Sequence, residues 1–465
     1  MRDRWPEVRI ADVADLVRGV TYAKDDARSS EQDGYVPVLR ATNIQAARLV
    51  LDSDLVFVPE ANVSATQKLR AGDIVVATSS GSKHLVGKSA LLGHDWGGSF
   101  GAFCAAIRPA ESVDPRYLAS FLQSPSYWKQ IGEKSMGVNI NNLRRGDIES
   151  VQLPLPDLDE QRRIVADIDK QFSRLDEAVA SLQRVKANLK RYKAAVLKAA
   201  VEGRLVETEA SIARREGRNP ESGETLLARI LQRRAEKWSG KGEVPTIKLS
   251  SKADLPSLPD GWTWCAFGVL GEDPFSTVQT GPFGAQLHNT DFCASGVPVI
   301  AVGNLTGTGF KREGLYFVGR AKADQLARYD VWAGDILFAR SGATLGKVCV
   351  APDDVADWRM TGHILRARLH NDFLDPHIAV YALSSMPAVT RQVFASVRGA
   401  TRPGFNTTLL ESIWIPVPPR VEQVRIVAEV ERRLSILSGI EADVEKNLRH
   451  ARALRQAVLS KSFSI

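Results

Sequence analysis

Residues 153–166 read LPLPDLDEQRRIVA, and residues 415–428 read IPVPPRVEQVRIVA. The two stretches lie 415 − 153 = 262 positions apart, and each joins a proline-bracketed apolar segment to the start of a long heptad pattern. An extended segment followed at once by a helix therefore occurs twice in one chain. This pattern predicts an internal tandem repeat with pseudo-twofold character.

Shorter blocks recur upstream in the same order. The tetrapeptide AGDI occupies residues 71–74 and 333–336, and PVL at 37–39 recurs as PVI at 298–300. Apolar runs separated by Gly, Ser and Asp predict short strands at 36–39, 73–77, 103–107, 151–156, 297–302, 335–339, 364–369 and 413–418. Helices are predicted at 115–123, 126–131 and 376–383. Each half is therefore expected to hold a mixed α/β block.

Apolar residues then repeat every seven positions, and no Gly or Pro interrupts residues 159–201. Such sustained heptads favour a coiled coil over a lone amphipathic helix. In the second copy Gly439 falls off the apolar spine, where it costs about 1 kcal/mol. The predicted helix-pairing positions are Ile168, Leu175, Leu182, Leu189, Val196, Val430, Leu437, Val444, Ala451 and Val458. The two helices are expected to pair with each other, in a direction that the sequence leaves open.

Four charged residues stand at companion positions of the spine that should be apolar, namely Lys186, Lys193, Glu441 and Arg455. Two interpretations remain open for them. Long side chains can lie along a partly exposed seam with their charges in water, or they can select register or partner.

Composition is that of an ordinary globular protein, with 44% hydrophobic and 25% charged residues among 465. The net charge is +7, and the excess falls in the helical blocks and the connector, a weak indication of a polyanionic partner. No apolar run is long enough for a membrane span, and no signal peptide is visible, which predicts a cytoplasmic protein without a membrane partner. The four cysteines form no CxxC pair, so reduced and mostly buried thiols are expected.

The sequence contains no convincing catalytic or metal-binding constellation. The seven histidines lack metal-ligand spacing, and the segment at 81–89 has five residues between its glycines where a phosphate loop needs four. A turn between strands is the favoured interpretation of that segment and of the related glycines at 342–346. No catalytic residues, no metal and no cofactor are assigned to this chain.

Polar loops on the two blocks are the remaining candidates for a binding site. Arg, Asn, Gln, Ser and Lys side chains are those that reach phosphates and base edges. For any single one, a solvated loop residue is the alternative, and the matched placement in both copies is the stronger argument. The candidates are Ser79, Ser80, Ser82, Lys83, His84, Asn139, Asn141 and Arg144 in the first copy, and Gly281, Gln286, His288, Arg340, Ser341, Thr344, Arg398, Thr401, Arg402 and Asn406 in the second.

This organisation resembles the specificity subunits of type I restriction–modification enzymes over essentially the whole chain. The resemblance rests on the duplicated segments quoted above, on LPDGW at 258–262 and on GPFG at 281–284. The first block departs from the pattern because it lacks GPFG and opens with only WPE at 5–7. Its base-reading loops are therefore less clearly marked than those of the second block.

The resemblance implies an α/β fold with two similar target recognition domains separated by two long helices that pair as a coiled coil. The domains would span 1–156 and 258–418, and the helices 157–202 and 419–465. The connector at 203–257 would hold one short docking helix, at 224–238, with Leu226, Leu227, Ile230 and Leu231 on one face.

The resemblance also implies a function without catalysis. Each domain would read one half of a split double-stranded DNA target, and the helices would set the gap and dock two methyltransferase subunits. Those partners would carry S-adenosylmethionine and flip the target adenines, and motor-nuclease subunits would join the complex. Two other classes of protein remain as alternatives: an enzyme with a hidden active site, and a coiled-coil protein scaffold without sequence-specific DNA binding.

Overall fold

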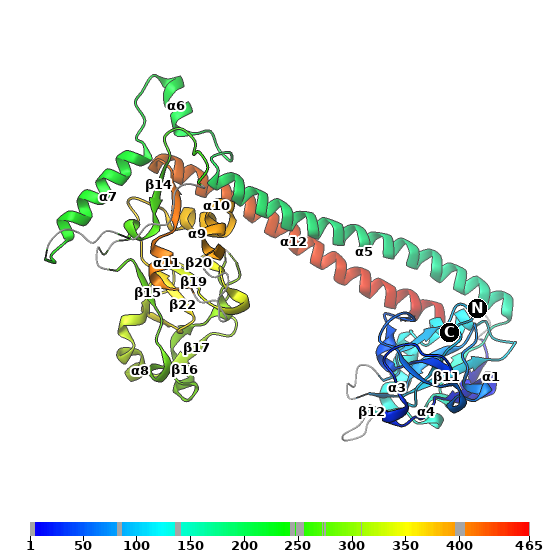
Figure 1. Ribbon diagram of the computed structural model, residues 1–465. Helices are drawn as coiled ribbons and strands as arrows, with labels where there is room; N and C mark the ends of the chain where they lie inside the picture. The colour runs from blue at the N-terminus through cyan, green and yellow to red at the C-terminus, as the bar shows by residue number, and fades with distance from the viewer. Residues whose placement is uncertain are drawn as a thin grey trace. The chain divides into compact units, whose positions relative to one another are not determined.

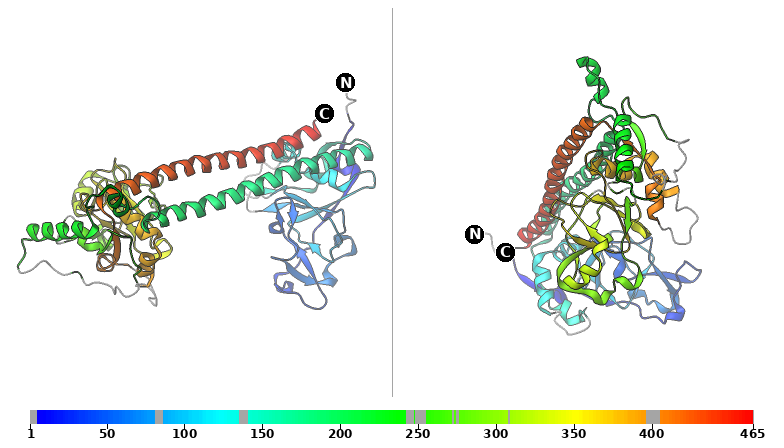
Figure 2. Two further views of the ribbon diagram at one scale, coloured as in Figure 1. Left: turned by 90° about the horizontal axis from the view of Figure 1, so that it is seen from above. Right: turned by 90° about the vertical axis from the view of Figure 1, so that its left-hand side faces the viewer.

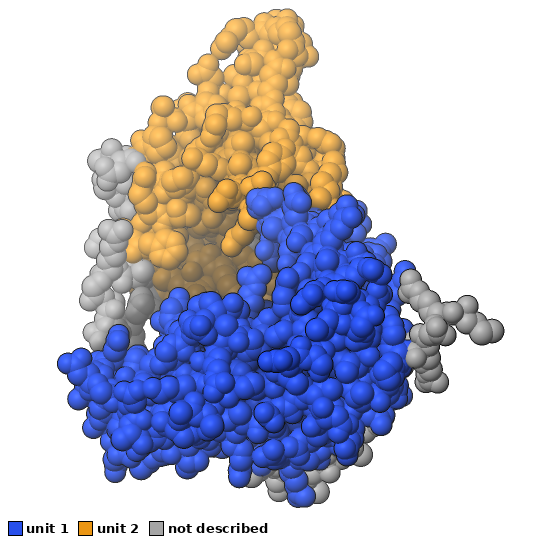
Figure 3. All heavy atoms as spheres, turned by 90° about the vertical axis from the view of Figure 1, so that its right-hand side faces the viewer, with its two compact units in different colours: residues 1–185, 443–465 blue, residues 186–442 orange. Residues whose placement is uncertain are grey.

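The computed structural model describes residues 5–80, 86–134, 141–241, 247, 255–271, 273, 276–307, 309–395 and 405–464. The chain forms two compact units, coloured separately in Figure 3. Unit 1 comprises residues 1–185 and 443–465, and unit 2 comprises residues 186–442. Each unit thus takes segments from both halves of the chain, because each long helix begins in one unit and ends in the other.

Unit 1 is built on an antiparallel four-stranded sheet in the order β2-β11-β7-β9. Its strands are β2 (Ala14–Arg18), β11 (Cys104–Pro109), β7 (Ile74–Ala77) and β9 (Ser89–Leu91). A second sheet has the order β10-β3-β6, with β10 (Ser99–Phe100), β3 (Tyr35–Leu39) and β6 (Val56–Pro59). The strand β1 (Glu7–Arg9) pairs antiparallel with β13 (Gln152–Pro154). The helices α2 (Pro115–Phe121), α3 (Pro125–Lys134) and α4 (Arg145–Glu149) complete the block.

Unit 2 repeats this plan. Its sheet β15-β22-β19-β20 consists of β15 (Val278–Thr280), β22 (Ile364–Ala367), β19 (Ile336–Ala339) and β20 (Val348–Val350). The second sheet is β17-β16-β21-β18, with β17 (Tyr316–Val318), β16 (Phe292–Ile300), β21 (Trp358–Met360) and β18 (Asp330–Val331). The strand β14 (Thr263–Ala266) pairs with β23 (Trp414–Val417) as β1 pairs with β13. The helices are α8 (Arg320–Gln325), α9 (Pro376–Ser385), α10 (Pro387–Ala395) and α11 (Thr407–Glu411). The predicted duplication of a mixed α/β block is confirmed.

The long helices are α5 (Leu158–Val201) and α12 (Arg420–Phe463), each of 44 residues. Within each unit their segments lie side by side and run in opposite directions (Figures 1 and 2). In unit 1, Arg455 forms a 2.7 Å ion pair with Asp176 and lies over the ring of Phe172. In unit 2, the Tyr192 side chain of α5 lies within electrostatic range of Arg433 on α12. These contacts decide the antiparallel direction that the sequence left open.

The predicted pairing positions are unequally buried along the two helices. On α12, Val430, Leu437, Val444 and Ala451 are buried, whereas Leu175, Leu182 and Leu189 of α5 are only half-buried. The ends of the two helices are more deeply buried. Ile168, Leu459 and Phe463 belong to the core of unit 1, and Val196 and Val430 belong to the core of unit 2. The pairing positions in the middle of α5 are therefore less deeply buried than those of α12.

The connector differs from its prediction in two ways. It carries two helices, α6 (Glu209–Glu216) and α7 (Gly223–Lys237), where the sequence predicted one. Leu226 and Ile230 are buried in the unit 2 core, but Leu231 is 51% exposed and does not share the docking face. Both helices begin at a hydroxyl cap, Thr208 and Ser222, and Gly217 in a left-handed conformation ends α6. The α6 segment is short and polar, so its capping residues were the main signal available in the sequence.

Candidate nucleic-acid interface

The repeated AGDI segment belongs to the framework of the sheet. Asp73 is buried and accepts hydrogen bonds from Nε and Nη2 of Arg108, both at 2.8 Å. Asp335 accepts the same two bonds from Arg368 at 2.7 Å. The glycine before each Asp has a positive φ, +92° at Gly72 and +82° at Gly334, where only glycine is unstrained. The motif therefore ties one strand to its neighbour through a bidentate ion pair.

The repeated glutamines are a second structural device. Gln161 is buried, donates to the carbonyls of Ser112 and Pro156, and accepts from the backbone N–H of Asp114. Gln423 repeats this pattern in unit 2, where its oxygen accepts from the N–H of Asp375 at 2.9 Å. Each glutamine thereby fixes the first turn of its long helix to the loop that precedes α2 or α9.

The neighbouring glutamates differ between the copies. Glu160 forms a surface ion pair with Arg163 at 2.6 Å. Glu422 is fully buried and accepts from the Trp262 indole at 3.0 Å and from the Glu209 N–H at 2.8 Å. Burial raises the pKa of Glu422, against the hydrogen bonds that lower it. In unit 2 this position anchors the connector through Glu209 and the start of the second block through Trp262.

The glycine–lysine pairs lie in the connections between neighbouring strands of each sheet; residues 81–85 of the first connection lie outside the described residues. The N–H of Gly87 donates to the carbonyl of Ala77, and that of Gly346 donates to Ala339. Both glycines have φ near +90° and stand two residues before a strand. Among the residues that the model describes, no cluster of three or more His, Cys, Asp or Glu could hold a metal ion. All four cysteines are free, and three of them are buried.

Unit 2 presents a hollow of about 680 Å³ at the ends of β15 and β19. The Arg340 guanidinium donates to Thr280 Oγ1 at 2.9 Å and lies 5.3 Å from the ring centre of Phe283, which is 57% exposed. On the neighbouring wall Phe292 stacks on Tyr316 with ring centres 4.6 Å apart. A cation beside exposed aromatic rings can contact phosphates, base edges and base faces.

Of the other predicted residues of unit 2, Ser341 lines this hollow, whereas Gly281 and His288 do not. Ser341 is hydrogen-bonded to His363 Nδ1 at 3.1 Å. Gly281 sits where a Cβ would meet the carbonyl oxygen of Thr361 at 2.2 Å, so the close approach requires glycine. His288 is exposed, and its backbone N–H donates to Asp291.

Three predicted residues have internal roles in the structure. The side-chain oxygen of Gln286 accepts from the Tyr329 hydroxyl at 2.8 Å. Thr344 donates to the carbonyl of Ser341, and Asn406 caps α11 by accepting from the Leu409 N–H. These atoms hold the loops in place. Arg398, Thr401 and Arg402 lie outside the described residues.

Unit 1 has a hollow of about 710 Å³ at the corresponding strand ends. The strands β8 (Ser79–Ser80) and β12 (Asn141–Asn142) pair with each other, which brings together two loops that the sequence named separately. Ser79 and Arg144 line the hollow; for Ser80 and Asn141 the model describes the backbone alone. Ser82, Lys83, His84 and Asn139 lie outside the described residues.

Sequence reasoning missed Arg18 and Phe103, which also line the unit 1 hollow, and Phe283, Tyr316 and His363 in unit 2. Phe103 is 68% exposed. The sequence signal for Arg18 was the glycine that follows it. A Cβ added at Gly19 would meet the Gly101 carbonyl oxygen at 2.1 Å, just as a Cβ added at Gly281 would meet the Thr361 carbonyl oxygen. Gly19 is thus the counterpart of the glycine that opens GPFG, in a block that lacks the rest of that motif.

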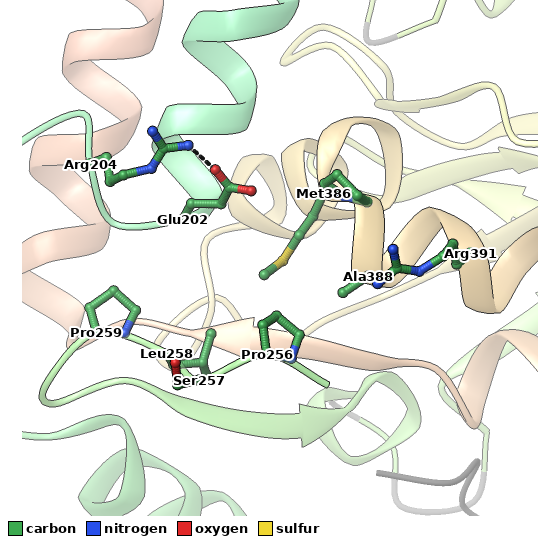
Figure 4. A pocket seen from close by; sticks show the side chains of 10 residues that line it. Glu202, Arg204, Pro256, Ser257, Leu258, Pro259, Met386, Ala388 and Arg391 are labelled. Carbon is green, nitrogen blue, oxygen red and sulfur yellow. Dashed lines mark hydrogen bonds and ion pairs between the residues drawn. The ribbon is translucent and has the colours of Figure 1, made fainter. Parts of the chain in front are cut away.

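A smaller cavity of about 330 Å³ lies in unit 2 where the connector rejoins the domain (Figure 4). Ion-paired Glu202 and Arg204 line it together with Leu258, Met386 and Arg391. Its walls join the end of α5 to the start of the second block and to α10. None of the predicted site residues lies there.

This chain is similar in sequence to known proteins. The family model described as the type I restriction modification DNA specificity domain matches residues 2–191. The EcoKI specificity subunit of Escherichia coli (strain K12) is 28% identical over 464 residues, covering 99% of this chain and 88% of that protein. The StySPI specificity subunit of Salmonella potsdam is 28% identical over 460 residues, with the same coverage.

A solved structure described as the basis of complex assembly and conformational transition of the type I R-M system has the same fold. Its matching chain gives a TM-score of 0.65 at 18% identity, covering 100% of this chain and 98% of the other. The two chains thus share one fold over their whole length. This chain is similar over nearly its whole length to specificity subunits of type I restriction enzymes, and residues 2–191 match the model of their DNA specificity domain.

Proposed function

We propose that each unit reads one half of a bipartite double-stranded DNA target and that the chain itself catalyses no step. The observation that carries this proposal is the contrast between the hollows. They lie at equivalent strand ends of a duplicated scaffold, yet different side chains line them. Two similar frames with different surfaces suit two half-sites of different sequence.

The paired helices would set the gap between half-sites and would dock methyltransferase subunits, two in number. Apolar side chains left exposed on α5 and α12 support the docking role. Tyr192 and Ile436 in unit 2 are 49% and 51% exposed, and Ile440 is 41% exposed. Such residues are typical of surfaces that a partner covers. S-adenosylmethionine would be carried by these partners, and restriction subunits would join the assembly.

Methylome sequencing tests the proposal. Cells carrying this chain with its methyltransferase should show a methylated motif of two defined halves and a fixed gap, and deletion of the chain should abolish it. Methylation that persists without the chain, or a motif with one half, would contradict the proposal. A scaffold that binds only proteins would show no salt-sensitive DNA affinity, which a salt titration of the purified complex measures.

The spacer role has its own test. Inserting seven residues into both α5 and α12, at paired positions, adds about 10 Å of helix at 1.5 Å per residue. The permitted gap should then lengthen by about three base pairs at 3.4 Å each. An unchanged gap would show that the helices do not set the spacing, while leaving the two-half motif intact.

A further inference from the structure

The two hollows can be aligned residue by residue through strand register. In unit 1 Arg18 faces Ala105 across β2 and β11, and Ala105 faces Val76 of β7. In unit 2 Thr280 faces Leu365 across β15 and β22, and Leu365 faces Phe338 of β19. Since Val76 and Phe338 are equivalent, Arg18 occupies the place of Thr280.

The same register places Thr78 where unit 2 has Arg340, because each residue directly follows the central strand, β7 or β19. Backbone hydrogen bonds agree with this assignment. The N–H of Thr78 donates to the carbonyl of Phe103 at 2.9 Å, and that of Arg340 donates to the carbonyl of His363 at 3.0 Å. An arginine and a threonine have therefore exchanged positions between the two copies.

Both arginines stand on rigid backbone at the rim of a hollow. Arg18 ends β2 and is followed by Gly19, which is packed against the Gly101 carbonyl. Arg340 follows β19 and is held by Thr280 and by the Phe283 ring. Well-supported backbone is what a base-reading side chain needs, because its bidentate geometry is narrow.

We infer that Arg18 is the specificity-determining arginine of unit 1 and the counterpart of Arg340, each reading a guanine in its own half-site. This inference rests on the proposed function. The guanidinium fork matches the O6 and N7 acceptors of guanine in the major groove. Thr78 and Thr280 occupy the complementary positions, and Thr280 orients its arginine directly.

The exchange attaches the arginine to a different strand. The strands β2 and β7 flank β11 on opposite sides, as β15 and β19 flank β22. The Arg340 guanidinium nevertheless reaches Thr280, the counterpart of Arg18, at 2.9 Å. The two arginines therefore serve the same rim of their hollows from different strands.

The test uses the chain in complex with its methyltransferase and reads the methylated motif of single variants. Arg18→Thr should relax one guanine position in one half-site by about 10- to 100-fold, the range of one bidentate contact. Arg340→Thr should relax one guanine in the other half-site. The double change Arg18→Thr with Thr78→Arg should restore the guanine preference in the first half-site.

Arg116→Thr is the matched control, since Arg116 pairs with Asp169 beside α5 and lies outside the hollow. Arg18→Lys keeps the charge and guards against misfolding; it should lose the guanine preference while the salt dependence of DNA binding stays unchanged. An unchanged motif for both Arg18 variants, or uniform loss across all sequences with a shallower salt slope, would overturn the inference. The bipartite motif of the unaltered complex tests the proposed function separately.

Discussion

Units 1 and 2 share the interactions that hold their sheets together and differ in the side chains at their strand ends. Asp73 with Arg108 matches Asp335 with Arg368, and Gln161 matches Gln423, with hydrogen-bond lengths that agree within 0.1 Å for the ion pairs. At the hollows, Arg18 stands where unit 2 has Thr280. These recurring residues therefore belong to the scaffold, whereas the side chains that differ at the strand ends line the hollows.

The largest expected effect concerns the buried ion pairs. Asp73→Ala leaves Arg108, only 18% exposed, without its carboxylate and should destabilise unit 1 by about 3 kcal/mol. Asp335→Ala should cost less, about 2 kcal/mol, because Arg368 is 35% exposed and keeps Asp330 at 3.6 Å. Hydrogen exchange in β11 and β22 measures each loss; an equal loss in both units would contradict this ordering.

The glycines at the hollows provide a second comparison. In Gly19→Ala and Gly281→Ala the new Cβ would meet a carbonyl oxygen near 2.1 and 2.2 Å, so each should cost about 2 kcal/mol and disturb one half-site. Gly97→Ala and Gly319→Ala are controls, because no atom lies within 4 Å of either new Cβ. Methylome profiles and hydrogen-exchange rates should change for the two hollow glycines and stay unchanged for the two controls. If Gly19→Ala changed neither, Gly19 would not be equivalent to Gly281.

The glutamates of the repeated EQ dipeptide should behave differently despite identical sequence. Glu422→Ala leaves the Trp262 indole and the Glu209 N–H without their buried acceptor and should cost unit 2 about 1.5 kcal/mol. Glu160→Ala removes a surface ion pair and should change stability by less than about 0.5 kcal/mol. Exchange rates in β14 and β13 report the two effects, and comparable losses would mean that Glu160 also anchors buried structure.

The sequence predicted the architecture because repeated motifs carry repeated hydrogen bonds. AGDI, EQ and the heptads each encode a local device that forms twice, and their constant spacing showed the duplication. Arg18 was not predicted as a site residue because its role depends on strand register. The strand β2 is about 60 residues away from β7 in the chain, and the two strands are linked only through β11. Phe103 and Phe283 are single aromatic residues whose exposure follows from tertiary packing, which no local pattern encodes.

The smallest expected effect is a pH dependence of the stability of unit 2, which unit 1 should lack. Asp375 caps α9 and contacts His377 Nδ1 at 3.0 Å, and this hydrogen bond raises the pKa of His377 above its ordinary 6.5. The corresponding residue of unit 1 is Arg116, which follows the α2 cap Asp114 and pairs with Asp169. Because the folded pKa is raised, the stabilisation is full below pH 6.5 and is lost as the pH rises through the folded value.

His377 is 41% exposed, so solvent screens the contact, and the melting temperature of unit 2 should fall by only about 1 °C across that window. His377→Arg should give unit 2 a permanent positive charge, as Arg116 gives unit 1, so that the melting temperature of unit 2 no longer changes with pH in this window. His377→Gln should also remove the pH dependence, but at the lower melting temperature of the uncharged histidine. Hydrogen exchange in the peptide spanning α9, measured at several pH values, resolves a change this small. A wild-type profile matching that of His377→Arg would show that the histidine contributes nothing that distinguishes the units.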